Sequence, residues 1–101
     1  MIIKEILAEL ETKDHPVAKA LYKSDAFKVL AIAFKKGMVL KEHKAHLPSK
    51  LIVMQGAVMY KNIDMECFLH QYDEHVIPAD EIHFVEAIED SLFLLIQGWG
   101  V

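Results

Sequence analysis

Arginine is absent from this chain: all eleven basic residues among its 101 residues are lysines. Arginine is the usual residue for forked recognition of phosphate, carboxylate and guanine, and nucleic-acid-binding proteins normally carry a basic stripe. Here the lysines are scattered and outnumbered by fifteen acidic residues, which gives a net charge of −4. We therefore expect no nucleic-acid partner and no tight binding of a strongly anionic ligand, although a lysine such as Lys50 could still serve as a point charge.

Cysteine is nearly absent as well, since Cys67 is the only one. A single cysteine excludes an internal disulfide, and Cys67 lies in an apolar stretch without a neighbouring base, which argues against a thiolate nucleophile. The longest apolar run, residues 29–34, is too short to cross a bilayer. Charges at Lys4 and Glu5 interrupt the N-terminus, so no secretory signal is indicated. These absences predict a cytoplasmic protein that does not enter membranes.

Linkers rich in proline, glycine or serine, low-complexity runs and internal repeats are also missing, so the length predicts one domain. Residues 2–10 carry apolar side chains at the spacing of one helix face, and the charged residues before Pro16 and Pro16 itself then end the helix. We expect residues 1–16 to form an N-terminal helix and arm, and residues 17–101 to form the main domain.

The rest of the chain alternates short apolar runs with turn signals, which is the pattern of an all-β domain. Turns are indicated at Lys36-Gly37 and at Pro48-Ser49, among other places. The strands are predicted near residues 17–22, 27–35, 39–43, 51–55, 57–61, 66–70, 75–77, 83–87 and 92–97.

Three stretches within the predicted strands, residues 29–34, 51–54 and 92–96, are apolar at every position instead of alternating. A strand in an antiparallel sheet normally has one polar face, so both faces of these strands must be covered. One face can pack inside a barrel, while the other needs the N-terminal helix or a second subunit. We therefore predict a homodimer. The alternative is that the two sheets and the helix cover everything.

Two sequence patterns resemble the motifs of the cupin family. Gly37, His43 after five intervening residues, and Gly56 thirteen positions beyond His43 resemble the first motif, G-x5-H-x-H-x(3,4)-E-x6-G. Residues 72–87 resemble the second motif, G-x5-P-x-G-x2-H-x3-N, with Pro78 and His83 at its proline and histidine. The resemblance spans about residues 17–97. It implies a small single-domain, RmlC-like cupin whose fold is a jelly-roll barrel, also called a double-stranded β-helix.

The chain departs from the family pattern at its ligand positions. The second histidine of the first motif is replaced by Ala45, and the glutamate position falls at Ser49 or Lys50. In the second motif, other residues replace both glycines and the asparagine; they are Tyr72, Asp80 and Ala87. Of the four metal ligands that the family implies, only those at His43 and His83 remain.

His46 could replace the missing histidine if the chain bends before Pro48, because His46 otherwise has the opposite strand parity to His43. The resemblance then implies a divalent transition metal (Fe, Mn, Zn or Ni) held by His43, His46 and His83. The alternative is a pair of cavity histidines that bind no metal. The other histidines, His15, His70 and His75, are predicted to be surface or strand-end residues.

The candidate pocket residues are Ser49, Lys50 and Gln55. Alternation along the fourth strand places Ser49 and Gln55 on one face, so Gln55 is a candidate inward polar group. The alternative is that Gln55 is solvated at the end of its strand.

Three functions fit these observations. One is a metal-dependent enzyme similar to small cupin dioxygenases or isomerases. The second is a metal-free module that binds or senses a small molecule, which the missing glutamate favours. The third is a structural partner of a larger assembly. The sequence identifies neither the ligand nor a reaction, because a fold alone does not determine function.

Overall fold

A computed structural model describes residues 1–43 and 45–101, with the backbone alone described at residues 42 and 43. In this part of the chain one helix, α1 (Ile2–Leu10), precedes nine strands. The strands are β1 (Val17–Lys23), β2 (Phe27–Phe34), β3 (Val39–His43), β4 (Ser49–Gln55), β5 (Ala57–Lys61), β6 (Glu66–His70), β7 (Glu74–Ile77), β8 (His83–Ala87) and β9 (Ser91–Gly98). None of the described helices is long and apolar enough to cross a bilayer.

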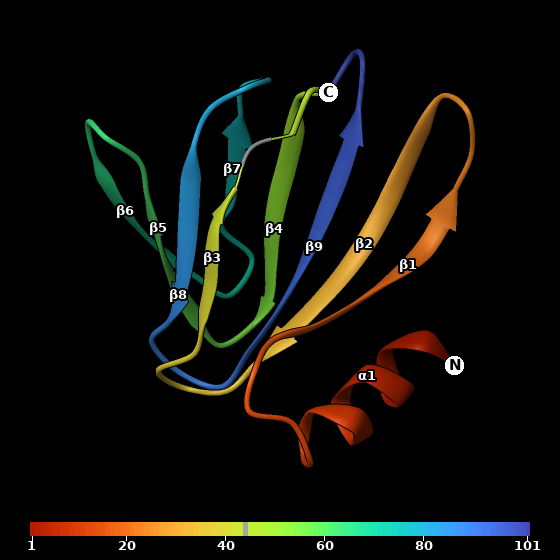
Figure 1. The fold of residues 1–101 in the computed structure, drawn as a ribbon, viewed down its shortest axis with the longest axis vertical. Coiled ribbons are helices and arrows are strands. Elements are labelled where there is room, and N and C mark those ends of the chain that lie inside the picture. Colours follow the sequence, from red (N-terminus) through yellow and green to blue (C-terminus); the bar gives the residue numbers. More distant parts are fainter. Residues whose placement is uncertain (44) are drawn as a thin grey trace.

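The strands form two antiparallel sheets that face each other (Figure 1). The five-stranded sheet has the order β1-β2-β9-β4-β7, and the four-stranded sheet has the order β3-β8-β5-β6. The chain crosses repeatedly between the sheets, which is the jelly-roll arrangement. The predicted all-β jelly-roll with a short N-terminal helix is therefore confirmed.

The interior of the barrel is filled by inward side chains from both sheets. Alternation along β2, β4, β5, β8 and β9 sends every second residue to this interior. The rings of Phe34 and Phe93 meet edge to face there, with their centroids 5.6 Å apart. The buried core consists of Ile32, Phe34, Leu51, Val53, Val58, Tyr60, Leu69, Ile77, Val85, Ala87, Phe93 and Leu95.

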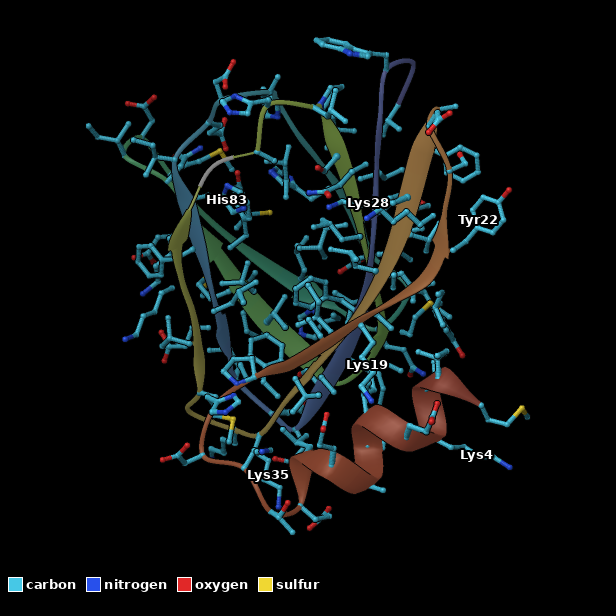
Figure 2. The ribbon with its side chains drawn as sticks, turned by 45° about the vertical axis from the view of Figure 1, so that its right-hand side comes forward. Lys4, Lys19, Tyr22, Lys28, Lys35 and His83 are labelled. Atoms are coloured by element: carbon cyan, nitrogen blue, oxygen red, sulfur yellow. The ribbon has the colours of Figure 1, made fainter. Side chains whose placement is uncertain are left out.

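The helix covers one end of the outer face of the five-stranded sheet (Figure 1). Ile6 and Leu10 pack there against Ala31 and Ala33 of β2, whose small side chains leave room for the helix. This second core explains why β2 is apolar on both faces. Two salt bridges flank this second core, and Figure 2 labels both of their lysines. Lys35 Nζ lies 3.0 Å from a carboxylate oxygen of the residue that caps the C-terminus of α1. Lys19 Nζ lies 4.0 Å from a carboxylate oxygen on the helix itself.

The outer face away from the helix keeps exposed apolar side chains. Tyr22 and Phe27 stack with their ring centroids 5.3 Å apart, and both are exposed (Figure 2 shows Tyr22 pointing outward). Val76 on the edge strand β7 is also half exposed. The helix therefore covers only part of the face that the sequence predicted to need a cover.

The two ends of the barrel differ in construction. We call the end with the β1–β2, β5–β6 and β7–β8 connections the mouth, and the opposite end the base (Figure 1, with the mouth at the top). At the base, Gly56 has a φ of 83°, and a Cβ there would collide with the carbonyl oxygen of Asp90 and with Ser91 Oγ. Ser91 Oγ also accepts from the backbone N–H of Ala57 at 3.1 Å. These contacts join the β4–β5 and β8–β9 turns.

Candidate functional site

Three rings meet inside the barrel toward its mouth. Tyr60 of β5 is fully buried, and His83 of β8, which is 3% exposed, stacks on it with a centroid separation of 5.3 Å (Figure 2 labels His83). His75 of β7 approaches the same phenol ring, with centroids 4.4 Å apart. Since β7 belongs to the five-stranded sheet and β5 and β8 to the other, Tyr60 contacts an imidazole from each sheet.

The phenol of Tyr60 donates a hydrogen bond to Glu81 Oε1, which also accepts from Asn62 Nδ2 at 3.1 Å. Burial raises the pKa of Glu81, but these two hydrogen bonds and the nearby charges of His83 and His75 outweigh burial and hold it below its usual value. Burial, followed by the hydrogen bond to Glu81 and its negative charge, raises the pKa of Tyr60. At neutral pH the pair is therefore a protonated phenol beside an ionised carboxylate.

The imidazole of His83 has a defined tautomer. Its Nδ1 lies 2.9 Å from the backbone oxygen of Glu81. A carbonyl oxygen can only accept, so Nδ1 carries the hydrogen, and in the neutral ring the lone pair lies on Nε2. Across the β3–β8 ladder, His43 is the register partner of His83. The side chain of His43 lies outside the described part of the structure.

A half-open cleft of about 580 Å³ lies at the mouth, between the β5–β6 turn and the β7–β8 connection. Asn62, Glu81 and His83 contribute to its wall, so the hydrogen-bonded groups of the interior reach the cleft. Apolar side chains of Ile82 and Phe84 line it as well. Asp64 and Asp80 line the cleft too, so it combines apolar walls with several polar groups, as small-molecule sites do.

His46 does not lie in the interior with His83. Its side chain is 91% exposed, and its Nδ1 lies 3.1 Å from Asp80 Oδ1 at the surface. Asp80 is tied to the same segment, because its backbone N–H donates to the carbonyl of Ala45 at 2.7 Å. The segment after β3 is thus docked on the β7–β8 connection, with the imidazole of His46 on the outside.

The three predicted pocket residues of β4 point in different directions. Ser49 is buried on the inner face, whereas Lys50 points outward, where its Nζ lies 2.8 Å from Glu74 Oε1. Gln55 is exposed near the base, beside the helix. The pairing of β4 with β9 shifts register between Val53 and Gln55, so strict alternation does not carry through to Gln55.

Sequence reasoning missed Tyr60, Glu81 and Asn62, and it gave His75 no part in the site. His75 was predicted to be a surface or strand-end residue; it lies near the start of β7 and contacts the buried Tyr60 ring. The signal was present in the alternation of β7, since Ile77 is buried and His75 lies two positions before it. Tyr60 shares its face with Val58 in the same way. Glu81 lies in a connection, where no periodicity predicts direction.

The described donors do not by themselves complete a metal site. Among the residues whose side chains are described, no three His, Cys, Asp or Glu side chains lie close enough together to hold an ion. The position of the family glutamate carries the hydroxyl of Ser49 or the outward ammonium of Lys50. The carboxylate of Glu81 is held by Tyr60 and Asn62.

Comparison with known proteins identifies the fold. No family model and no curated protein matches the chain by sequence. Solved structures do match: a cupin superfamily protein from Desulfitobacterium hafniense has a TM-score of 0.80 at 21% identity, with 85% of this chain and 79% of that chain covered. An RmlC-like cupin from Desulfovibrio desulfuricans gives 0.77 at 22% identity, covering 83% and 82%.

A cupin-2 domain protein from Shewanella frigidimarina matches over 95% of this chain and 91% of its own, with a TM-score of 0.74 at 15% identity. The predicted resemblance is thus confirmed at the level of the fold: the chain is a small cupin-fold protein.

Proposed function

We propose that the protein binds a small organic molecule at the mouth of its barrel and needs no metal ion to do so. The cleft beside Glu81 and His83 carries this proposal, because it joins apolar walls to a carboxylate held in place by two hydrogen bonds. Perturbed pKa values of the kind found for Tyr60 and Glu81 are frequent at functional sites.

Glu81 is the residue most suited to recognise such a ligand. Both side-chain hydrogen bonds that it accepts, from Tyr60 and Asn62, go to Oε1. A hydroxyl or amine of a ligand would therefore meet Oε2. The ligand's apolar part would lie against Ile82 and Phe84, which line the same cleft.

A thermal-shift screen of small metabolites on EDTA-treated protein tests this function. We expect at least one compound to raise the melting temperature without added metal, because a ligand that binds only the folded state stabilises it. Glu81→Gln should weaken that binding, while Glu89→Gln, which changes an exposed carboxylate in another connection, should leave it unchanged. A melting temperature that responds to metals alone would contradict the proposal.

A divalent transition metal is the second candidate, and the register pairing of His43 with His83 favours it. Metal-binding histidines commonly donate the other ring N–H to a backbone carbonyl, as His83 does to Glu81. Fe, Mn, Zn or Ni would then be held by His43 and His83, and His46 would have to turn inward from Asp80 to complete the predicted set.

Metal analysis of untagged protein, expressed with each of these four metals in turn, distinguishes the two candidates. A stoichiometric metal that His83→Ala removes and His70→Ala retains would support the metal site, since His70 is exposed. Substoichiometric metal under every supplement would rule it out.

We also propose that two copies pair through the outer face of the five-stranded sheet. Tyr22, Phe27 and Val76 remain exposed there beyond the reach of the helix. Apolar surface of this kind is typical of interfaces between subunits. Light scattering should give about twice the monomer mass of 11.5 kDa, and Tyr22→Glu should lower it. A monomer at all concentrations would contradict pairing.

A further inference from the structure

Three polar residues stand side by side on neighbouring strands of the five-stranded sheet. Lys28 of β2 is the register partner of Gln97 of β9, and Gln97 is also the register partner of Ser49 of β4. Since side chains two apart share a face, Lys28 lies on the face of Leu30, and Ser49 on that of Leu51. Both leucines contact the barrel core. We call Lys28, Gln97 and Ser49 the inner polar row.

The inner polar row lies at the mouth end of the sheet, near the start of β2 and β4 and the end of β9 (Figure 1, and Figure 2 for Lys28). Its middle and last members are deeply buried: Gln97 is 7% exposed and Ser49 is 2% exposed. Lys28 is half-buried at the rim. A cation, an amide and a hydroxyl thus occupy adjacent positions on a mostly apolar inner face.

No side-chain hydrogen bond or ion pair joins any member of the row to another described residue. Nevertheless, no fully buried side-chain nitrogen or oxygen in the described part of the chain lacks a partner. The polar atoms of Gln97 and Ser49 must therefore reach solvent-accessible space on the inside of the barrel. Polar groups in such a position are satisfied by water or by a bound molecule.

We propose that the inner polar row, whose members do not line the cleft itself, binds the carboxylate of a small molecule that reaches from the mouth into the barrel. This inference rests on the proposed binding function and specifies its ligand class. The ammonium of Lys28, the amide N–H of Gln97 and the hydroxyl of Ser49 are all donors, and a carboxylate offers two acceptor oxygens. The positive charge of Lys28 matches the negative charge of a carboxylate.

Titration calorimetry in chloride-free buffer at low ionic strength tests the inference with butyrate as the probe, and with butyramide and butylamine as neutral and cationic probes of similar size. We expect butyrate to bind and the other two to bind at least about tenfold more weakly, because a charge-assisted hydrogen bond is lost. Lys28→Met should weaken butyrate binding by a similar factor. Lys4→Met is the control, since Lys4 is exposed on α1, outside the barrel (Figure 2).

Gln97→Leu separates recognition from folding. It removes an amide that has no described partner, so we expect the urea midpoint to stay equal or rise while butyrate binding falls. A merely structural glutamine would instead lower the midpoint and leave the affinity unchanged.

Three results would overturn the inference: no butyrate binding, equal binding of butyramide, or equal affinity in Lys28→Met. Displacement of butyrate by an equal concentration of inorganic phosphate would also overturn the assignment to carboxylates. The proposed binding function would survive any of these results if metal-free protein still responded to another compound in the metabolite screen.

Discussion

Tyr60 and Glu81, which lie twenty-one residues apart, are joined by a hydrogen bond from the phenol to Oε1 of the carboxylate. The ring of Tyr60 is fully buried in the core, while Glu81 belongs to the connection between β7 and β8. This bond therefore attaches a mouth segment to the barrel wall. It also links stability to the ionisation of a group in the candidate site.

Tyr60→Phe should lower the free energy of unfolding by about 1–3 kcal/mol at pH 7, because the carboxylate of Glu81 loses a donor while the packing of the ring is kept. Urea denaturation measures this. Tyr22→Phe is the control, since Tyr22 is exposed and its ring stacks only at the surface. Equal effects of the two substitutions would show that the Tyr60 hydroxyl does not support the fold.

The stability of the protein should fall in acid partly through Glu81. Its pKa in the folded state lies below the ordinary value of 4.5, so its contribution is fully present above pH 4.5 and is lost as the pH falls through the folded-state pKa. Urea midpoints between pH 7 and pH 3 should therefore decline less in Glu81→Gln than in the parent protein. Glu89→Gln should decline like the parent. Parallel curves for all three proteins would contradict a depressed pKa.

Gly56→Ala should be far more destabilising than Gly37→Ala. Both glycines have positive φ, 83° and 87°, which costs a residue with a Cβ about 1–2 kcal/mol. A Cβ at Gly37 meets nothing within 4 Å, whereas at Gly56 it collides with Asp90 and Ser91. Overpacking adds about 1–3 kcal/mol to the second variant. Equal urea midpoints of the two variants would mean that the close contacts of Gly56 do not stabilise the turns at the base.

Ile6→Ala should destabilise the fold by about 2–5 kcal/mol, because Ile6 is fully buried between the helix and the sheet. Leu7→Ala on the same helix is the control, since Leu7 is 37% exposed and should cost much less. Thermal or urea unfolding measures both. A small effect of Ile6→Ala would show that the helix is not an integral part of the fold.

Much of the fold could be predicted because apolar alternation and turn residues are local signals. The helix was predicted at its observed bounds, and the bounds of every strand differ by no more than two residues. The motif spacing also placed His43 and His83 on strands that pair with each other in register. The cupin resemblance thus carried information about long-range pairing that periodicity alone lacks.

The candidate site was harder to predict because it depends on local departures from regularity. The register shift after Val53 disrupts the alternation that suggested an inward Gln55. His46 lies at the surface beside Asp80, and no spacing rule encodes that contact. The lysine on the inner face is Lys28 and not Lys50, because β2 alternates without interruption up to its first residues.

The contacts that join the β4–β5 and β8–β9 turns give the two ends of the barrel different structural roles. The close contacts of Gly56 lie at the base, while the segments that carry Asn62, Glu81 and His46 lie at the other end. Those segments can therefore accumulate substitutions, or be exchanged for segments of other lengths, without loosening the contacts that hold the two sheets in register. Such an architecture can acquire a new binding surface by replacing its mouth segments while the contacts at the base stay intact.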